Sequence, residues 1–278
     1  MTRPDSGSPP QPTAAHHLPW GASAREWRDA LAMNDLWINL ALEDLRDRYR
    51  RTALGLAWIV VSFALFVAVK VAIFGQLSSV PAAEFGLFVT LGFGLWTFIN
   101  STMTDACTAY THARHWILGT ATPYPVYILQ SVARNIMTFM LVFLVMVAAL
   151  ALKPSLWSPT MLWAIPGLLA YALCSVWLTA LLAPLCVYYR DLHHAVQTFM
   201  RLLFFATPIL WLPSTNGMLA SIAVWNPASH FVAIVREPLL YGNVPLDSWL
   251  VVAGINLAGL PAGILAYARS RSSLIFWI

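Results

Sequence analysis

Charge is scarce in this chain. Only 10% of its 278 residues are Asp, Glu, Lys or Arg, whereas 59% are hydrophobic. A water-soluble domain carries roughly a quarter charged residues, so water is excluded as the solvent for most of the chain. The charge-free stretches 154–189, 202–235 and 248–268 each exceed the about 20 residues that a helix needs to cross a bilayer. We therefore expect an all-α polytopic membrane protein, whose helices satisfy their own backbone hydrogen bonds.

Lysine is scarcer still. The chain has two lysines, Lys70 and Lys153, and neither follows a glycine. A nucleotide-binding P-loop needs the sequence Gly-Lys-Ser/Thr, so the chain is not expected to hold ATP in such a loop. If ATP drives its activity, a partner must bind the nucleotide, and the chain itself is not an enzyme.

Cysteines and carboxylates are too few to indicate a metal or cofactor site. Cys107, Cys174 and Cys186 form no CxxC pair, and their odd number argues against a disulfide framework. Beyond residue 52 the carboxylates are Glu84, Asp105, Asp191, Glu237 and Asp247. A membrane-embedded glycosyl or lipid transferase stays open as an alternative, because Asp105 and Asp191, both on the expected cytoplasmic side, could chelate Mg²⁺. An ion-coupled transporter is disfavoured, because no ionisable residue lies near the middle of an expected span.

The composition changes along the chain and divides it into three parts. Residues 1–22 are rich in proline and lack an apolar core, which predicts a disordered tail. In residues 23–52, apolar side chains from Trp27 to Tyr49 follow one helical stripe opposite charged residues. This pattern predicts an amphipathic helix lying in the membrane interface, with a surface helix of a small soluble cap as the alternative. Residues 53–278 are expected to form one transmembrane domain.

About six spans fit into that domain. They are predicted near residues 53–74, 85–103, 128–150, 161–188, 196–212 and 249–267. Between the last two, residues 212–247 hold apolar pieces too short to cross, broken by Pro213, Pro227 and Pro238. Such interrupted segments predict two short re-entrant helices on the outer side. In the last span, Gly259 and Gly263 form a GxxxG pattern that favours close helix approach, and a dimer interface is one use of it.

Basic residues set the orientation. With these spans, eleven arginines fall on the side of the two termini and only Lys153 and Arg236 on the other. The positive-inside rule then places both termini in the cytoplasm. The excess fits contact with anionic membrane lipids, and nucleic acid is not needed to explain it. Lys70, Arg134 and Arg201 lie within spans, where a charge either serves a function or snorkels to the interface.

Several stretches, taken in order, resemble one family. Residues 44–52 read DLRDRYRRT and precede Leu54-Gly55 and Trp58; Arg134-Asn135 follows the prolines at 123 and 125; Arg190-Asp191 leads to FFATPILW at 204–211; and residues 226–242 read NPASHFVAIVREPLLYG. Together they resemble the permeases of ABC-2 type transporters, in the branch that exports O-antigen, capsule and teichoic-acid polymers. The chain departs from this pattern at Leu56, where a proline is common.

The resemblance implies a homodimer of permeases in the bacterial cytoplasmic membrane, bound to two copies of a separate ABC ATPase that holds ATP and Mg²⁺. Two cytoplasmic connections would contact that ATPase. The residues expected at this contact are Tyr110, His112, Arg114, His115, Trp116, Arg190 and Asp191. An ABC-2 exporter of lipids or drugs is the nearest alternative, since it shares the fold and the partner.

The resemblance also implies a substrate, a glycan linked to polyprenyl pyrophosphate. Arg48, Arg50 and Arg51 could contact its pyrophosphate, because guanidinium groups bind phosphate oxygens bidentately; they could instead be positive-inside anchors. Aromatic rings offer sliding surfaces for sugars, although rings in spans also face lipid or neighbouring helices. The rings expected along the path are Trp58, Phe63, Trp96, Phe98, Phe139, Tyr171, Trp177, Phe204, Phe205 and Trp211.

Overall fold

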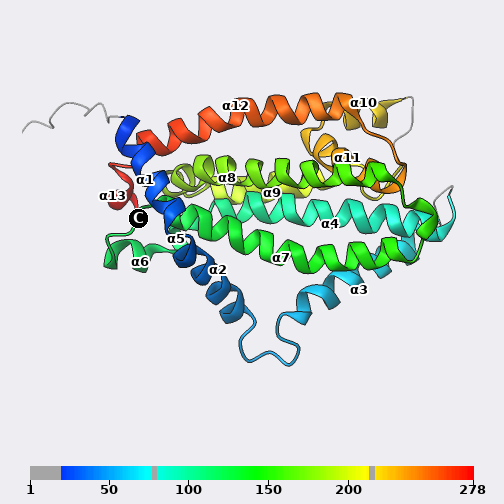
Figure 1. Ribbon diagram of the computed structural model, residues 1–278, viewed down its shortest axis with the longest axis horizontal. Helices are drawn as coiled ribbons and strands as arrows, with labels where there is room; N and C mark the ends of the chain where they lie inside the picture. The colour runs from blue at the N-terminus through cyan, green and yellow to red at the C-terminus, as the bar shows by residue number, and fades with distance from the viewer. Residues whose placement is uncertain (1–19, 77–79, 213–216) are drawn as a thin grey trace, which may run out of the picture.

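The computed structural model describes residues 20–76, 80–212 and 217–278 and shows an α-helical bundle (Figure 1). These three stretches contain helices and turns and no strand. The predicted disordered tail falls almost wholly outside the described residues. Its last three residues belong to the first helix, which begins at Trp20.

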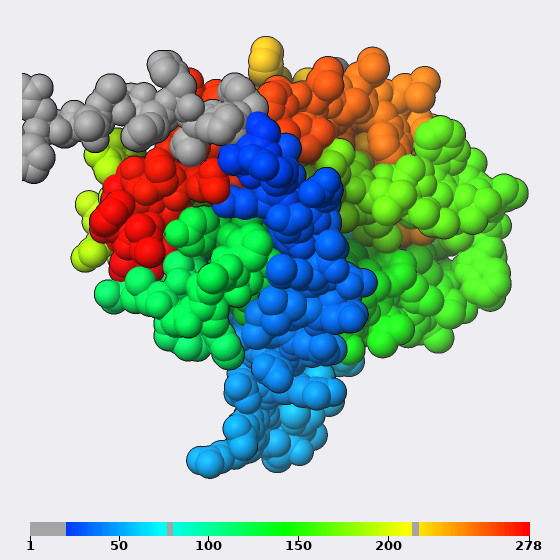
Figure 2. Space-filling view, turned by 60° about the vertical axis from the view of Figure 1, so that its left-hand side comes forward, coloured from blue at the N-terminus to red at the C-terminus, as the bar shows by residue number. Residues whose placement is uncertain are grey.

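The predicted interface helix is two helices. α1 (Trp20–Ala32) and α2 (Asn34–Arg48) meet at Met33, where the backbone leaves the helical region. Ala41 and Leu45 of α2 are buried, and both helices lie against α7 (Pro125–Ala151). Figure 2 shows them as a blue band on the surface. The apolar side of this segment therefore packs on the bundle, and its charged side faces outward.

Five helices are long and apolar enough to cross a membrane, counted over the described residues. They are α3 (Ala57–Phe74), α4 (Ala82–Ala106), α7, α8 (Ala164–Tyr188, preceded by the 3-10 turn η2, Pro159–Trp163) and α12 (Leu246–Ser270). The predicted fifth span appears as α9 (Leu192–Ala206), whose 15 residues extend about 22 Å. The helix ends there because Pro208 has no backbone N–H to continue the helical hydrogen bonds, and the chain is non-helical to residue 212.

Burial separates the centre of the bundle from its edge. In the most apolar window of α4, 61% of residues are buried, against 17% in α3. α4 contacts α3, α7, α8, α9 and α11 (Pro227–Leu240), so it lies in the interior of the bundle. The exposed surface of α3 is apolar, and in a membrane protein such a surface meets lipid or another chain.

The GxxxG pattern is used inside the chain. α12 lies along α8, and a Cβ atom on Gly263 would come within 2.6 Å of the Trp177 carbonyl oxygen. Gly259 faces the indole of the same residue. The indole Nε1 also donates to Asn256 Oδ1 at 2.9 Å. These glycines therefore seat Trp177 between α8 and α12, which is an alternative to the dimer contact.

The segment between α9 and α12 doubles back, as predicted. α10 (Met218–Trp225) and α11 meet at a bend of 89° at Asn226. Leu212, before the pair, and Leu240, at its end, line one cavity of about 300 Å³ together with Lys153. The chain therefore enters and leaves this segment at the same end of the bundle, near the 3-10 turn η1 (Pro154–Leu156).

The opposite end gathers the first and last described helices. Glu26 of α1 accepts hydrogen bonds from the Tyr267 hydroxyl and from Arg271 Nε, the latter at 2.6 Å. The short helices α5 (Ala109–His112), α6 (Arg114–Gly119) and α13 (Leu274–Trp277) lie at this end too (Figure 1, left). The described chain therefore begins and ends at the same end of the bundle.

Candidate functional site

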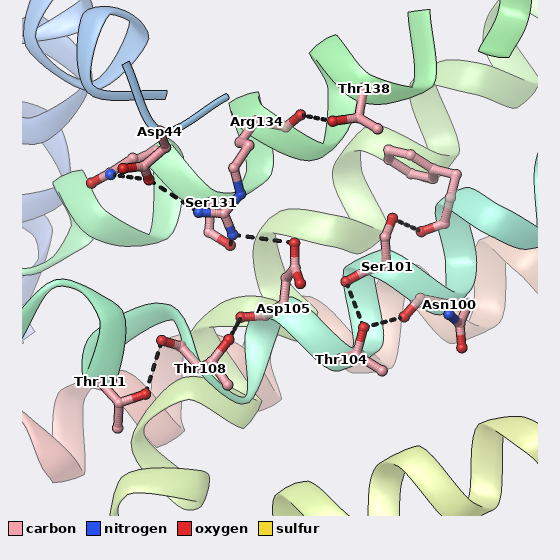
Figure 3. A network of polar contacts seen from close by, with 12 residues as sticks. Asp44, Asn100, Ser101, Thr104, Asp105, Thr108, Thr111, Ser131, Arg134 and Thr138 are labelled. Carbon is pink, nitrogen blue, oxygen red and sulfur yellow. Dashed lines mark hydrogen bonds and ion pairs between the residues drawn. The ribbon is translucent and has the colours of Figure 1, made fainter. Parts of the chain in front are cut away.

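A buried arginine joins three helices at the end of the bundle that holds α1, α5, α6 and α13, which we call the arginine-rich end. Arg134 of α7 places Nη1 3.1 Å from Asp44 Oδ2 of α2, and Nη2 3.2 Å from Asp105 Oδ2 of α4. Figure 3 shows the guanidinium between the two carboxylates. Gln130 Nε2 donates to the same Asp44 oxygen at 2.7 Å, and Ser131 Oγ accepts from Arg134 at 3.4 Å. The arginine is therefore neutralised by protein, and it ties the surface helix to the core.

A cavity of about 300 Å³ opens beside this cluster. Asp44, Gln130 and Arg134 line one side, and His112 and His115 of the α5–α6 region line another. Two buried polar atoms, Arg134 Nε and Gln130 Oε1, have no hydrogen-bond partner among the described residues. The cavity is thus polar, and it adjoins both the surface helix and the connection after α4.

His112 is electrostatically linked to the cluster. Loss of hydration in the cavity lowers the pKa of His112, and the nearby charge of Arg134 lowers it further. Asp105 acts in the opposite direction. Since the ordinary pKa of histidine is about 6.5, His112 is neutral at pH 7 and can accept or donate a hydrogen bond without adding charge.

Two contacts hold the re-entrant segment at the other end of the bundle. Arg236 of α11 is buried and donates from Nη1 to the Pro208 carbonyl oxygen at 2.6 Å, while its guanidinium lies 4.0 Å from the centroid of the Phe88 ring. Asn226 Nδ2 donates to Thr207 Oγ1 at 2.8 Å. Residues from two separate stretches of the sequence pattern, 204–211 and 226–242, therefore meet.

Comparison with known proteins gives relatives along most of the chain, although no family model matches it. An O-antigen export system permease protein RfbA of Klebsiella pneumoniae is 26% identical over 230 residues, which are 80% of this chain and 88% of the relative. A second RfbA from that organism is 25% identical over 227 residues, with the same coverage. RfbA of Myxococcus xanthus is 27% identical over 238 residues, covering 83% of this chain and 91% of the relative. The predicted resemblance to ABC-2 permeases of polysaccharide export is confirmed.

The residues predicted to contact an ATPase lie at the arginine-rich end. His112, Arg114, His115 and Trp116 are exposed on α5 and α6, and Arg190 and Asp191 are exposed after α8. Tyr110 differs, because its side chain is fully buried between the connection and the bundle. Its ring can support the surface of the other residues but cannot form part of that surface in this arrangement.

The arginines predicted to meet a pyrophosphate lie around the turn after α2. Arg48 lines the cavity near Arg134, whereas Arg50 and Arg51 lie in the connection 49–56. This connection stands away from the bundle at the lower edge of Figure 1. Arg51 has a φ of +64°, which is uncommon for a residue with a side chain, and Arg50 pairs only loosely with Asp47, at 3.8 Å. All three guanidinium groups are accessible, and their role remains a prediction.

The predicted path aromatics fall into two groups. Phe98, Phe139 and Tyr171 form an interior cluster, with ring centroids 5.1 and 5.8 Å apart from Phe98. Nearer the α3 and α9 surface, Phe204 lies 5.5 Å from both Trp96 and Phe205. Of the remaining rings, Phe63 stacks on Phe93 near the second group, and Trp177 packs against α12. Trp58 and Trp211 are partly exposed. Their role in a path remains a prediction.

Sequence reasoning did not find the clusters around Arg134 and Arg236. For Arg134, a signal existed: an arginine inside a span needs a partner, and carboxylates near a span end are few. For Arg236, the sequence placed the residue in an outer connection, whereas it is buried in α11. No local pattern indicated that its partner is a carbonyl group 28 positions away.

Proposed function

We propose that this permease is the membrane subunit of an ABC exporter that moves polyprenyl-pyrophosphate-linked polysaccharide, of the O-antigen, capsule, galactan or teichoic-acid type, across the bacterial cytoplasmic membrane. The observation that carries the proposal is the likeness to O-antigen export permeases over at least 80% of the chain. The lack of a lysine after glycine supports a separate ATPase, which would bind ATP and Mg²⁺.

The arginine-rich end would face the cytoplasm. It holds the first and last described helices, joined by Glu26 and Arg271, and the exposed Arg114 and Arg190. Positive residues favour this side of the membrane. The exposed residues of α5 and α6 would then meet the ATPase, with Arg190 and Asp191 beside them.

The cluster at Arg134 would transmit movement of the ATPase contact to the helices of the bundle. Asp105 lies in the last turn of α4, immediately before the connection that bears the proposed ATPase contacts. A shift of this connection reaches Arg134 through Asp105, and the surface helix α2 through Asp44. ATP binding to the partner would thereby favour one arrangement of the bundle over another.

Two permeases would enclose the path, since the exposed apolar surface of α3 needs lipid or a second chain. Arg48, Arg50 and Arg51 would receive the pyrophosphate, and the aromatic rings would offer stacking surfaces to the sugars.

Purification of the permease from native membranes tests the proposal. An ABC ATPase is expected to copurify, and cells that lack the permease are expected to accumulate polyprenyl-linked glycan. Arg114→Glu on α6 should reduce the copurified ATPase on the order of tenfold, because it reverses an exposed charge at the contact. Arg28→Glu on α1, equally exposed, is the matched control and should retain it.

Other outcomes would replace the proposal. If the ATPase copurifies and no lipid-linked glycan accumulates, the permease exports lipids or drugs instead. If the purified chain transfers sugars or lipids without a partner, it is a membrane-embedded transferase.

A further inference from the structure

Lys70 points its ammonium group at aromatic rings within the membrane-spanning bundle. Nζ lies 3.1 Å from the centroid of Phe93 on α4, 4.9 Å from that of Phe204 on α9 and 5.8 Å from that of Phe66 on α3. Aromatic faces attract cations through their quadrupole. Three helices thus contribute to one cationic and aromatic patch, which we define by these four residues.

The ammonium group points away from the nearer membrane surface. α3 ends at Phe74, one turn beyond Lys70, yet the ring under Nζ belongs to Phe93, which also stacks on Phe63 at 5.7 Å. Phe63 precedes Lys70 by two turns, so the ammonium lies deeper than its own Cα atom. Side chains on a helix tilt toward its N-terminus, which here is the bilayer interior. Snorkelling to the near end does not describe this geometry.

Lys70 has no carboxylate partner among the described residues. None of the ion pairs formed by the described residues includes it; Lys153, the other lysine, pairs with Glu84. An unpaired cation at membrane depth is costly unless it lines a water-filled space. The rings reduce this cost without supplying a counter-ion. The patch therefore belongs on a hydrated face of the assembly.

A largely aromatic groove that also contains several polar side chains adjoins the patch. It has a volume of about 290 Å³, and Phe66 and Phe93 line it together with Ser62, Thr97 and Asn135. Asn135 is buried beside this groove, and its side chain forms no hydrogen bond within the described stretches. Hydroxyl and amide groups interleaved with aromatic rings suit sugars, which offer both hydroxyls and apolar faces.

A second unpaired cation lies close by. Arg201 is exposed on α9 and forms no ion pair with a described residue. It precedes Phe204 by three residues, which places both on one side of the helix. The surface around the patch thus carries positive charge without compensation by protein.

We propose that the patch of Lys70, Phe66, Phe93 and Phe204 lines the translocation path and selects glycans that carry acidic groups, carboxylate or phosphate, on their sugars. The inference rests on the proposed export function and names the substrate class. A lone ammonium binds a passing anion transiently, and transport needs sites that release as well as bind. Lipid phosphates lie at headgroup level, whereas this ammonium points inward.

The first test is chemical and needs no variant. The surface polymer of cells that express this permease is compared with that of cells lacking it, and the permease-dependent polymer is hydrolysed and assayed for uronic acid, other acidic sugars and phosphate. Acidic groups in the repeat unit are expected. A wholly neutral repeat unit overturns the inference and leaves the proposed export function intact.

The second test addresses the hydrated face. In a background with Cys107, Cys174 and Cys186 replaced by serine, Lys70→Cys should react with a membrane-impermeant sulfonated thiol reagent. Leu257→Cys on α12, whose side chain is 76% exposed in the chain, is the control and should not react. Equal, negligible labelling of both overturns the hydrated face.

The third test separates the sugars from the lipid carrier. In cells that make an acidic or a neutral polymer on the same carrier, Lys70→Glu should reduce export of the acidic polymer on the order of tenfold, by local repulsion, and spare the neutral one. Lys70→Arg should retain both. Equal loss of both polymers assigns the ammonium to the common pyrophosphate and overturns the selectivity. Failure of wild-type cells to export either polymer would instead refute the proposed function.

Discussion

Two cations within the helical bundle of this protein have opposite surroundings. Arg134 meets Asp44 and Asp105, each within 3.2 Å, and its side chain is 6% exposed. Lys70 meets aromatic rings and no carboxylate of the described residues. A cation that is paired with carboxylates of the protein holds helices together. A cation without a counter-ion is available to bind an anionic substrate. The same residue class thus serves packing at one site and recognition at the other.

Replacement of Arg134 should have the largest effect on stability. Arg134→Met leaves two carboxylates facing each other, and loss of one partner of a buried ion pair costs about 3–5 kcal/mol. Because Asp44 is 41% exposed and can be hydrated, we expect about 3 kcal/mol, at the lower end of that range. Thermal unfolding in detergent, followed by tryptophan fluorescence, measures it.

The matched control is Arg48→Met, which lines the same cavity without an ion pair to a described residue. It should change stability by no more than about 0.5 kcal/mol. Equal losses of stability in the two variants would show that the protein responds to the loss of any positive charge at this cavity. The ion pairs of Arg134 would then not explain its effect on stability.

Arg236 should give an intermediate effect, because it is buried but paired with a carbonyl group and a ring. Arg236→Met removes the donor to the Pro208 carbonyl and leaves that oxygen unpaired, which costs about 1–3 kcal/mol. The same unfolding measurement applies. Lys153→Met is the control, since its 3.9 Å pair with Glu84 is partly exposed and contributes at most about 1 kcal/mol. A larger loss for Arg236→Met than for Arg134→Met would contradict the ranking.

The sequence predicts the architecture well because charge and proline are distributed unevenly. The charge-free stretches 154–189 and 248–268 locate α8 and α12, and prolines around residue 227 locate the re-entrant pair. The break at Met33 was not predicted, because no glycine or proline marks it. The 15-residue length of α9 was also missed, since apolar residues continue past its end at Ala206.

The site could be predicted only in part. Arg134 was recognised as unusual, yet its pairing with Asp44 depends on the rotation of helices 90 positions apart. Local periodicity carries no such information. The aromatic rings present the same difficulty: a helix that is apolar on all sides does not reveal which ring faces the interior. Phe98 is buried and Phe205 is 71% exposed, although both were assigned to one path.

Lys70 should give the smallest effect on stability. Lys70→Met removes a cation–π contact, worth about 0.5–2 kcal/mol, but it also removes the cost of an ammonium group at membrane depth, about 2.5–3.5 kcal/mol on insertion scales. These terms oppose each other, so the unfolding temperature should not fall below that of the unchanged protein. If it falls as far as in Arg134→Met, the ammonium holds the fold together and is not free for a substrate. An unchanged or raised unfolding temperature, together with impaired export of an acidic polymer, separates the two kinds of cation: Arg134 contributes to stability, and Lys70 contributes to transport.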